Sequence, residues 1–144
     1  MKIKKITGLS QQHGVAAVEF ALIASIFFTL VFGVMEMGRI LFYMNSAAEA
    51  TRLGARVAVV CDANAAIIKT KMIKMLGILT TADIEISYIP PSCNASTCES
   101  VSVSVKKENI KTFIPFVPLT FKLPPFSTTL PRESMTSASN PVCS

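Results

Sequence analysis

The sequence predicts an α+β protein in which a long N-terminal transmembrane and amphipathic helix precedes a small antiparallel sheet module with a second helix. Three observations predict this class. An apolar stretch with a single charge lies near the N-terminus, a helical pattern continues beyond it, and the apolar period changes to two after residue 83. We expect a leader (1–14), a long helix (15–61) whose membrane-spanning part is 15–41, and an outer module (62–144).

The leader is short and mostly polar, and it carries several lysines that precede the apolar stretch. Cations before a span stay on the cytoplasmic side, so the N-terminus is expected in the cytoplasm and the module outside. The next segment, Val15 to Val34, has 20 residues and one charge, Glu19. About 20 apolar residues cross a bilayer as a helix. A carboxylate at mid-bilayer costs roughly 2.5–3.5 kcal/mol on insertion scales, so Glu19 should have a compensating partner.

Small residues on the expected span favour contact with another helix. Ala17, Ala21 and Ala24 follow one another at spacings of four and three, which places them on one side of a helix. Small side chains at such spacing let a second backbone approach closely. With Phe20 they form the packing surface that the sequence predicts, although alanine is also simply common in helices.

Helical character continues outside the span to about Cys61. Polar residues recur there at spacings of four, three and four, opposite small and apolar ones, which is typical of an amphipathic helix. These polar residues are Asn45, Glu49, Arg52 and Arg56. A second helix is expected over 65–76, with Asp62 and Asn64 as capping residues and Gly77 as its end.

Alternation of apolar and polar residues then predicts strands. It runs through Ile84–Tyr88 and Val101–Val105, and we expect these two strands to form a hairpin. Residues 110–117 and 119–123 are further candidate strands that their prolines confine to edges or turns. A last strand is expected over 128–135.

Four cysteines lie downstream of the span, which suits an oxidising compartment and two disulfides. A zinc site is disfavoured because there is no C-x-x-C pair and no histidine in this part of the chain. Three connectivities are open. We favour Cys93–Cys98, which closes a short loop at the hairpin tip, and Cys61–Cys143, which ties the chain's end to the helix.

Composition and motifs argue against several functions. The net charge is +5, but the leader lysines account for three charges and the remaining cations form no stripe with aromatic platforms, so no nucleic-acid partner is expected. His13 is the only histidine, and no phosphate-binding loop or nucleophile elbow occurs. We therefore expect no enzymatic activity, no metal or other cofactor and no small-molecule substrate.

The stretch Gly14-Val15-Ala16-Ala17-Val18-Glu19-Phe20 resembles the processing signature of type IV prepilins and pseudopilins. The longer run GVAAVEFALIASIFFTLVFGVMEMGRILF, with AAEATRLGARVAVV after it, is similar to TadE-like minor pseudopilins of tight-adherence (Tad, Flp) pilus systems. The resemblance covers about residues 14–60 and implies a pilin-like fold.

The resemblance also implies how the protein is processed, where it is located and what it binds. A prepilin peptidase would cut between Gly14 and Val15, and Glu19, then the fifth residue, would pair with the new α-amine of a neighbouring subunit. One departure is Val15, where many type IVa pilins have phenylalanine or methionine. The implied place is the bacterial inner membrane, with the module periplasmic or extracellular and the protein pilus-associated. The implied partners are the membrane, the peptidase and other pilin or pseudopilin subunits.

The first interpretation is therefore a non-catalytic minor pseudopilin that assembles or primes a Tad-type pilus used in cell adhesion. A major filament subunit is a second interpretation, which the large outer module disfavours. A third is a single-pass membrane protein whose outer module binds a ligand or an envelope partner, without a filament role.

Overall fold

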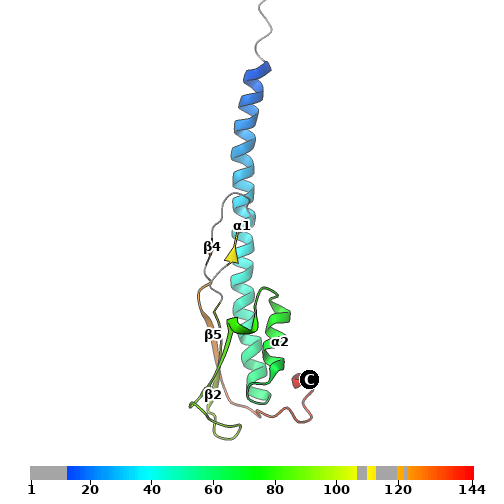
Figure 1. Cartoon of the computed structure of the whole chain (residues 1–144), viewed down its shortest axis with the longest axis vertical. Coiled ribbons are helices and arrows are strands. Elements are labelled where there is room, and N and C mark those ends of the chain that lie inside the picture. Colours follow the sequence, from blue (N-terminus) through cyan, green and yellow to red (C-terminus); the bar gives the residue numbers. More distant parts are fainter. Residues whose placement is uncertain (1–12, 107–109, 113–119, 122) are drawn as a thin grey trace, which may run out of the picture. The chain divides into compact units, whose positions relative to one another are not determined.

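The computed structural model describes residues 13–106, 110–112, 120–121 and 123–144, and it has the α+β architecture that the sequence predicts (Figure 1). Contacts divide the chain into two units, residues up to Gly38 and residues Arg39–Ser144. The elements are α1 (His13–Val60), α2 (Ala66–Met75), a 3₁₀ turn (Thr81–Asp83), β1 (Ile84–Ile89), β2 (Ser100–Val105), β3 (Ile110–Lys111), β4 (Thr120–Phe121), β5 (Phe126–Pro131) and a second 3₁₀ turn (Pro141–Cys143).

The C-terminal end of α1 is held by a segment from far along the chain. The last carbonyl groups of a helix lack partners within the helix. Here the carbonyl of Val59 accepts from the backbone N–H groups of Glu133 and Met135, at 3.2 and 3.1 Å. The carbonyl of Val60 accepts from Thr136 N–H at 3.0 Å. The helix ends at Val60 because these distant donors satisfy its final carbonyls.

Three antiparallel strands in the order β1-β2-β5 form the main sheet, which confirms the expected hairpin. In β2, Val101, Val103 and Val105 are fully buried, whereas the intervening serines are half-buried. One face therefore packs on the core and the other meets solvent, as is common for antiparallel sheets.

The later strands differ from their expected bounds. The last strand, β5, covers Phe126–Pro131 rather than 128–135, because the residues from Glu133 onward leave the sheet to bond to the end of α1. β3 and β4 are two-residue strands that pair Ile110 with Phe121. Residues 113–119 and 122 of the expected strands lie outside the described residues.

The core of the Arg39–Ser144 unit is built on small residues of α1. Ala47, Ala50 and Ala58 are fully buried, and Gly54 lies among them in sequence. Short side chains let neighbouring elements come close to the helix backbone. The buried residues from α2 and β2 that complete this cluster are Ile68, Met72, Val101, Val103 and Val105.

The expected caps of the second helix are wrong. Ala65 occupies the N-cap of α2, and no side chain caps it. Asp62 instead exchanges two hydrogen bonds with Ser137, in which the Asp62 N–H donates to the serine Oγ at 3.0 Å and the Ser137 N–H donates to the carboxylate at 3.2 Å. Asn64 adopts a left-handed conformation (φ 59°) in the turn before the helix. Both residues therefore lie in the connection between α1 and α2, and neither side chain caps α2.

Candidate assembly surface

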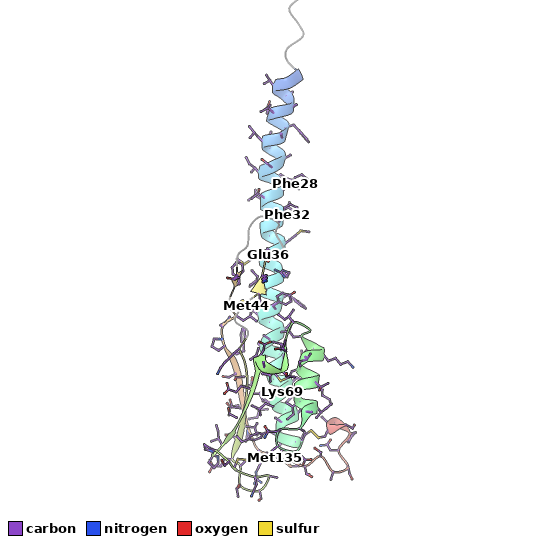
Figure 2. All side chains as sticks on the ribbon, in the orientation of Figure 1. Phe28, Phe32, Glu36, Met44, Lys69 and Met135 are labelled. Carbon is purple, nitrogen blue, oxygen red and sulfur yellow. A yellow bond between two sulfur atoms is a disulfide. The ribbon has the colours of Figure 1, made fainter. Side chains whose placement is uncertain are left out.

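The first part of α1 exposes apolar side chains on all sides. Val15 is 69% exposed and Phe20 is 74% exposed. An 18-residue window of this helix has a mean hydropathy of 2.4, and none of the window is buried. Figure 2 shows Phe28 and Phe32 projecting from the helix. Soluble monomers rarely expose apolar patches of this extent, so this segment requires lipid or protein neighbours.

Gly14 and Val15 lie in the first turn of α1, which begins at His13. A Cβ atom added at Gly14 would meet no heavy atom within 4 Å. Packing against the residues that the structure describes therefore does not require glycine at this position.

Glu19 lies four residues after Val15 on α1, which is a rise of about 6 Å along the helix axis. The side chain is exposed. Among the residues that the structure describes, it forms no hydrogen bond or ion pair. The carboxylate that the sequence singled out is therefore available to a group outside this chain.

The alanine surface and Glu19 lie on different sides of the helix. Successive residues of an α-helix are about 100° apart, so Ala17, Ala21 and Ala24 fall within about 60° of one another. Phe20 borders the same side, with a separation of about 60° from Ala17. Glu19 is about 200° away from Ala17. The structure brings the small residues together and leaves Glu19 apart from them.

The structure joins all four cysteines in disulfides, Cys61 to Cys143 and Cys93 to Cys98, which is the pairing favoured from the sequence. The Cα atoms of Cys61 and Cys143 are 5.6 Å apart, so the end of the chain is fixed directly after α1. The second bond closes the loop between β1 and β2.

A polar groove of about 410 Å³ lies beside β1, and its charged side chains already have partners within the chain. Lys106 donates to Glu85 at 2.6 Å, and this hydrogen bond together with the lysine charge lowers the pKa of the Glu85 carboxyl. Lys69 donates to the carbonyl of Thr81 at 3.1 Å. Within the described ranges no group of three or more histidine, cysteine, aspartate or glutamate side chains could hold a metal ion.

Sequence reasoning missed how residues 132–136 are used. Arg132 donates to the carbonyl of Ala95 at 2.5 Å, Ser134 Oγ donates to Val60 O at 3.1 Å, and Met135 is 1% exposed. Met135 has a positive φ of 42°, which is uncommon for a side chain of its size. No periodic pattern marks such a segment, so the sequence gives no signal for its role as a helix cap.

The fold and the surface define a class of protein: a disulfide-bonded α+β module carried by an apolar helix that indicates a membrane anchor. Residues 14–56 match the family model of TadE-like proteins, which confirms the resemblance drawn from the sequence over this segment. The matched segment covers less than half of the chain. It contains Gly14, Glu19 and the alanine surface. Neither a curated protein nor a solved structure matches the chain significantly.

Proposed function

We propose that this protein is a minor pseudopilin that is processed after Gly14 and takes part in assembling or priming a Tad/Flp-type pilus, without a catalytic role. One observation carries the proposal. Glu19 is an exposed carboxylate without a partner in the described chain, one turn after Gly14–Val15, on an apolar helix that matches TadE-like proteins. It would be costly to place in lipid alone.

Processing would supply the partner that Glu19 lacks. Cleavage after Gly14 turns the Val15 amide into an α-amine, which can carry a positive charge as an ammonium group. In an assembly, this amine and the Glu19 carboxylate of an adjacent copy or related subunit would neutralise each other. Removing one member of a buried ion pair leaves the other charge uncompensated, which makes the pair a strong requirement for assembly.

The separation of Glu19 from the alanine surface supports contact with more than one neighbour. A helix that packed against a single partner through Ala17, Ala21 and Ala24 would point Glu19 away from that partner. With two neighbours, one can take the small-residue side and another can take the carboxylate. A filament or an initiating cluster provides such neighbours.

The proposed orientation places the N-terminus in the cytoplasm and the disulfide-bonded module in the periplasm or outside the cell. The lysines before the span support this direction. The two disulfides support an oxidising compartment for the module.

Mass spectrometry of the membrane-extracted protein tests processing. In cells that carry a Tad prepilin peptidase we expect the mature chain to begin at Val15, and in cells without the enzyme we expect residues 1–14 to be retained. Gly14→Leu should block cleavage without changing the fold, because the added side chain meets no atom of the chain within contact range of its Cβ. Retention of residues 1–14 beside an active peptidase would contradict the proposal.

Piliation of cells that carry Glu19→Ala or Glu19→Gln tests the charge pair. We expect normal cleavage and membrane insertion but loss of pilus assembly in both variants. Ser25→Ala is a control on the same helix, because Ser25 is exposed and its Oγ donates to the Leu22 carbonyl of that helix. Ala21→Leu should also lower assembly, because the larger side chain would keep a neighbouring helix from approaching the alanine surface. Unchanged piliation of the Glu19 variants would refute the filament role.

A further inference from the structure

We propose that the paired strands β3 and β4, together with residues of α1 next to Arg39 in the sequence, rest in the headgroup layer of an anionic phospholipid bilayer. We call this surface the interfacial belt and define it as Arg39, Leu41, Phe42, Lys111 and Phe121. The inference rests on the proposed function in one respect, namely that the helix up to about residue 41 spans the membrane. It adds a second, peripheral attachment of the outer module to the same membrane.

A direct hydrogen bond fixes the hairpin beside the place where the span is expected to end. Arg39 Nη2 donates to the carbonyl oxygen of Lys111 in β3 at 2.7 Å. The same guanidinium lies 5.5 Å from the centre of the Tyr43 ring, one turn further along α1. In Figure 1, the short yellow arrow of β3 lies next to α1. Arg39 directly follows the apolar segment in the same helix, so this hydrogen bond places Lys111 next to the residue at which that segment ends.

The exposed apolar side chains of the Arg39–Ser144 unit support a lipid contact at this level. Phe42 is 63% exposed and Leu41 is 51% exposed, more than any other large apolar residue that the structure describes in this unit. Phe121, in β4, is 37% exposed although its cross-strand partner Ile110 is buried. Leu41 and Phe42 belong to α1, and Phe121 belongs to β4, which pairs with the strand that accepts the Arg39 hydrogen bond. Contact with the bilayer would remove their apolar area from water.

Charge favours the polar layer of the bilayer over its hydrocarbon core. Lys111 is exposed, and it pairs with Thr120 on the face of the hairpin opposite to Ile110. A lysine at a membrane boundary can lay its apolar stem along the acyl region while its ammonium reaches the phosphates. Cations near an anionic membrane surface are also attracted to it within a Debye length. Tyr43, whose ring lies 5.5 Å from the Arg39 guanidinium, is of an aromatic type that is enriched in this layer.

Fluorescence quenching by brominated lipids tests the proposal, because the chain has no tryptophan. Four variants of the full chain, Phe28→Trp, Phe42→Trp, Phe121→Trp and Val142→Trp, are reconstituted in phosphatidylethanolamine–phosphatidylglycerol vesicles with bromine at shallow or deep acyl positions. Val142 is a control whose exposure (43%) is similar to that of Phe121 (37%). It is next to Cys143, which is bonded to Cys61, and Cys61 follows Leu41 by about 30 Å along the helix.

We expect deep bromines to quench Phe28→Trp, shallow bromines to quench both Phe42→Trp and Phe121→Trp, and neither to quench Val142→Trp. If Phe28→Trp is quenched but Phe121→Trp behaves like Val142→Trp, the belt is refuted while the anchor stands. If Phe28→Trp is not quenched, the anchor and the proposed function fail, and the belt fails with them. Far-ultraviolet circular dichroism verifies that each variant is folded.

The charge contribution is tested in the Phe121→Trp background. Adding Lys111→Glu should remove most of the quenching gained when phosphatidylglycerol replaces a neutral lipid. Lys74→Glu, an exposed charge reversal on α2, should leave that gain unchanged. Equal quenching of both double variants in anionic vesicles would refute recognition of the lipid phosphates by Lys111.

Discussion

At Gly54, α1 lies in close contact with α2 and β2 of the outer module. A Cβ atom added there would overlap Sδ of Met72 and would lie 3.1 Å from both Met72 Cγ and Val103 Cγ1. Met72 and Val103 are fully buried, so neither can move aside into solvent. We therefore predict that Gly54→Ala destabilises the outer module.

Two opposing effects set the magnitude. An extra methyl group in a well-packed core costs typically about 1–3 kcal/mol through displaced side chains and backbone. Replacing glycine by alanine inside a helix returns about 0.8–1 kcal/mol. The net loss for Gly54→Ala is therefore about 0–2 kcal/mol.

Gly38→Ala is the matched control, because Gly38 lies in the same helix and an added Cβ there would meet no atom within 4 Å. The control keeps the helix-propensity gain without the overlap. The two variants should therefore differ by about 1–3 kcal/mol, the cost of the overlap alone. The free energy of unfolding is measured by chemical denaturation of the full chain in detergent micelles, with circular dichroism of the module as the signal.

A double-mutant cycle with Met72→Ala makes the test specific. Met72→Ala alone should cost about 2–5 kcal/mol, as large-to-small core changes do. Adding Gly54→Ala to that background should be neutral or stabilising, because the methyl group fills part of the space that Met72 leaves. If Gly54→Ala is as stable as Gly38→Ala, or if the cycle shows no coupling, the close contact at Gly54 does not exist.

Three further predictions concern the outer module. Loss of the Cys61–Cys143 bond should destabilise the module about twice as much as loss of the Cys93–Cys98 bond, because the two bonds join residues separated by 82 and 5 positions. The loop-entropy model gives about 4 kcal/mol for the first bond and about 2 kcal/mol for the second. Thermal melting of variants in which both cysteines of one bond are replaced by serine measures this difference, and equal losses would contradict it. Ser134→Ala should cost about 0.5–1.5 kcal/mol by removing the bond to Val60 O, seen as faster amide exchange at the end of α1. Because the Lys106 hydrogen bond and charge lower the pKa of Glu85, the pair should stabilise the fold above the ordinary glutamate pKa and lose this effect as pH falls through the lowered value. Lys106→Met should return the pKa of Glu85 toward its ordinary value in an NMR titration, and an unchanged pKa would rule out the pairing.

The elements with strong periodicity could be predicted from the sequence. The apolar stretch from Val15 and the small-residue side of the following turns indicate one long helix, which the structure confirms as α1. The alternation through Ile84–Tyr88 and Val101–Val105 likewise indicates the hairpin of β1 and β2. In both cases local side-chain spacing reports directly on which face is buried.

Other features depend on contacts that no local pattern encodes. Asp62 has the residue type of a helix cap, yet it bonds to Ser137, 75 residues away. The last strand ends early because backbone groups from Glu133 onward satisfy the end of α1 instead of continuing the sheet. For the candidate site, the sequence indicated Glu19 and the alanines as separate features. The geometry of α1 shows in addition that they lie on different sides of the helix.

The family match ends at Arg56, two residues after Gly54, and so it includes both the exposed apolar segment and most of the small-residue side on which the module packs. The two parts of this helix therefore differ in which side chains are exposed and which are buried. Before Gly38 its apolar side chains are exposed among the residues that the structure describes, whereas after Arg39 its alanines are buried by α2 and β2. Substitutions at Gly54 should then affect the stability of the module, and substitutions at Glu19 should affect assembly, without either change producing the other effect.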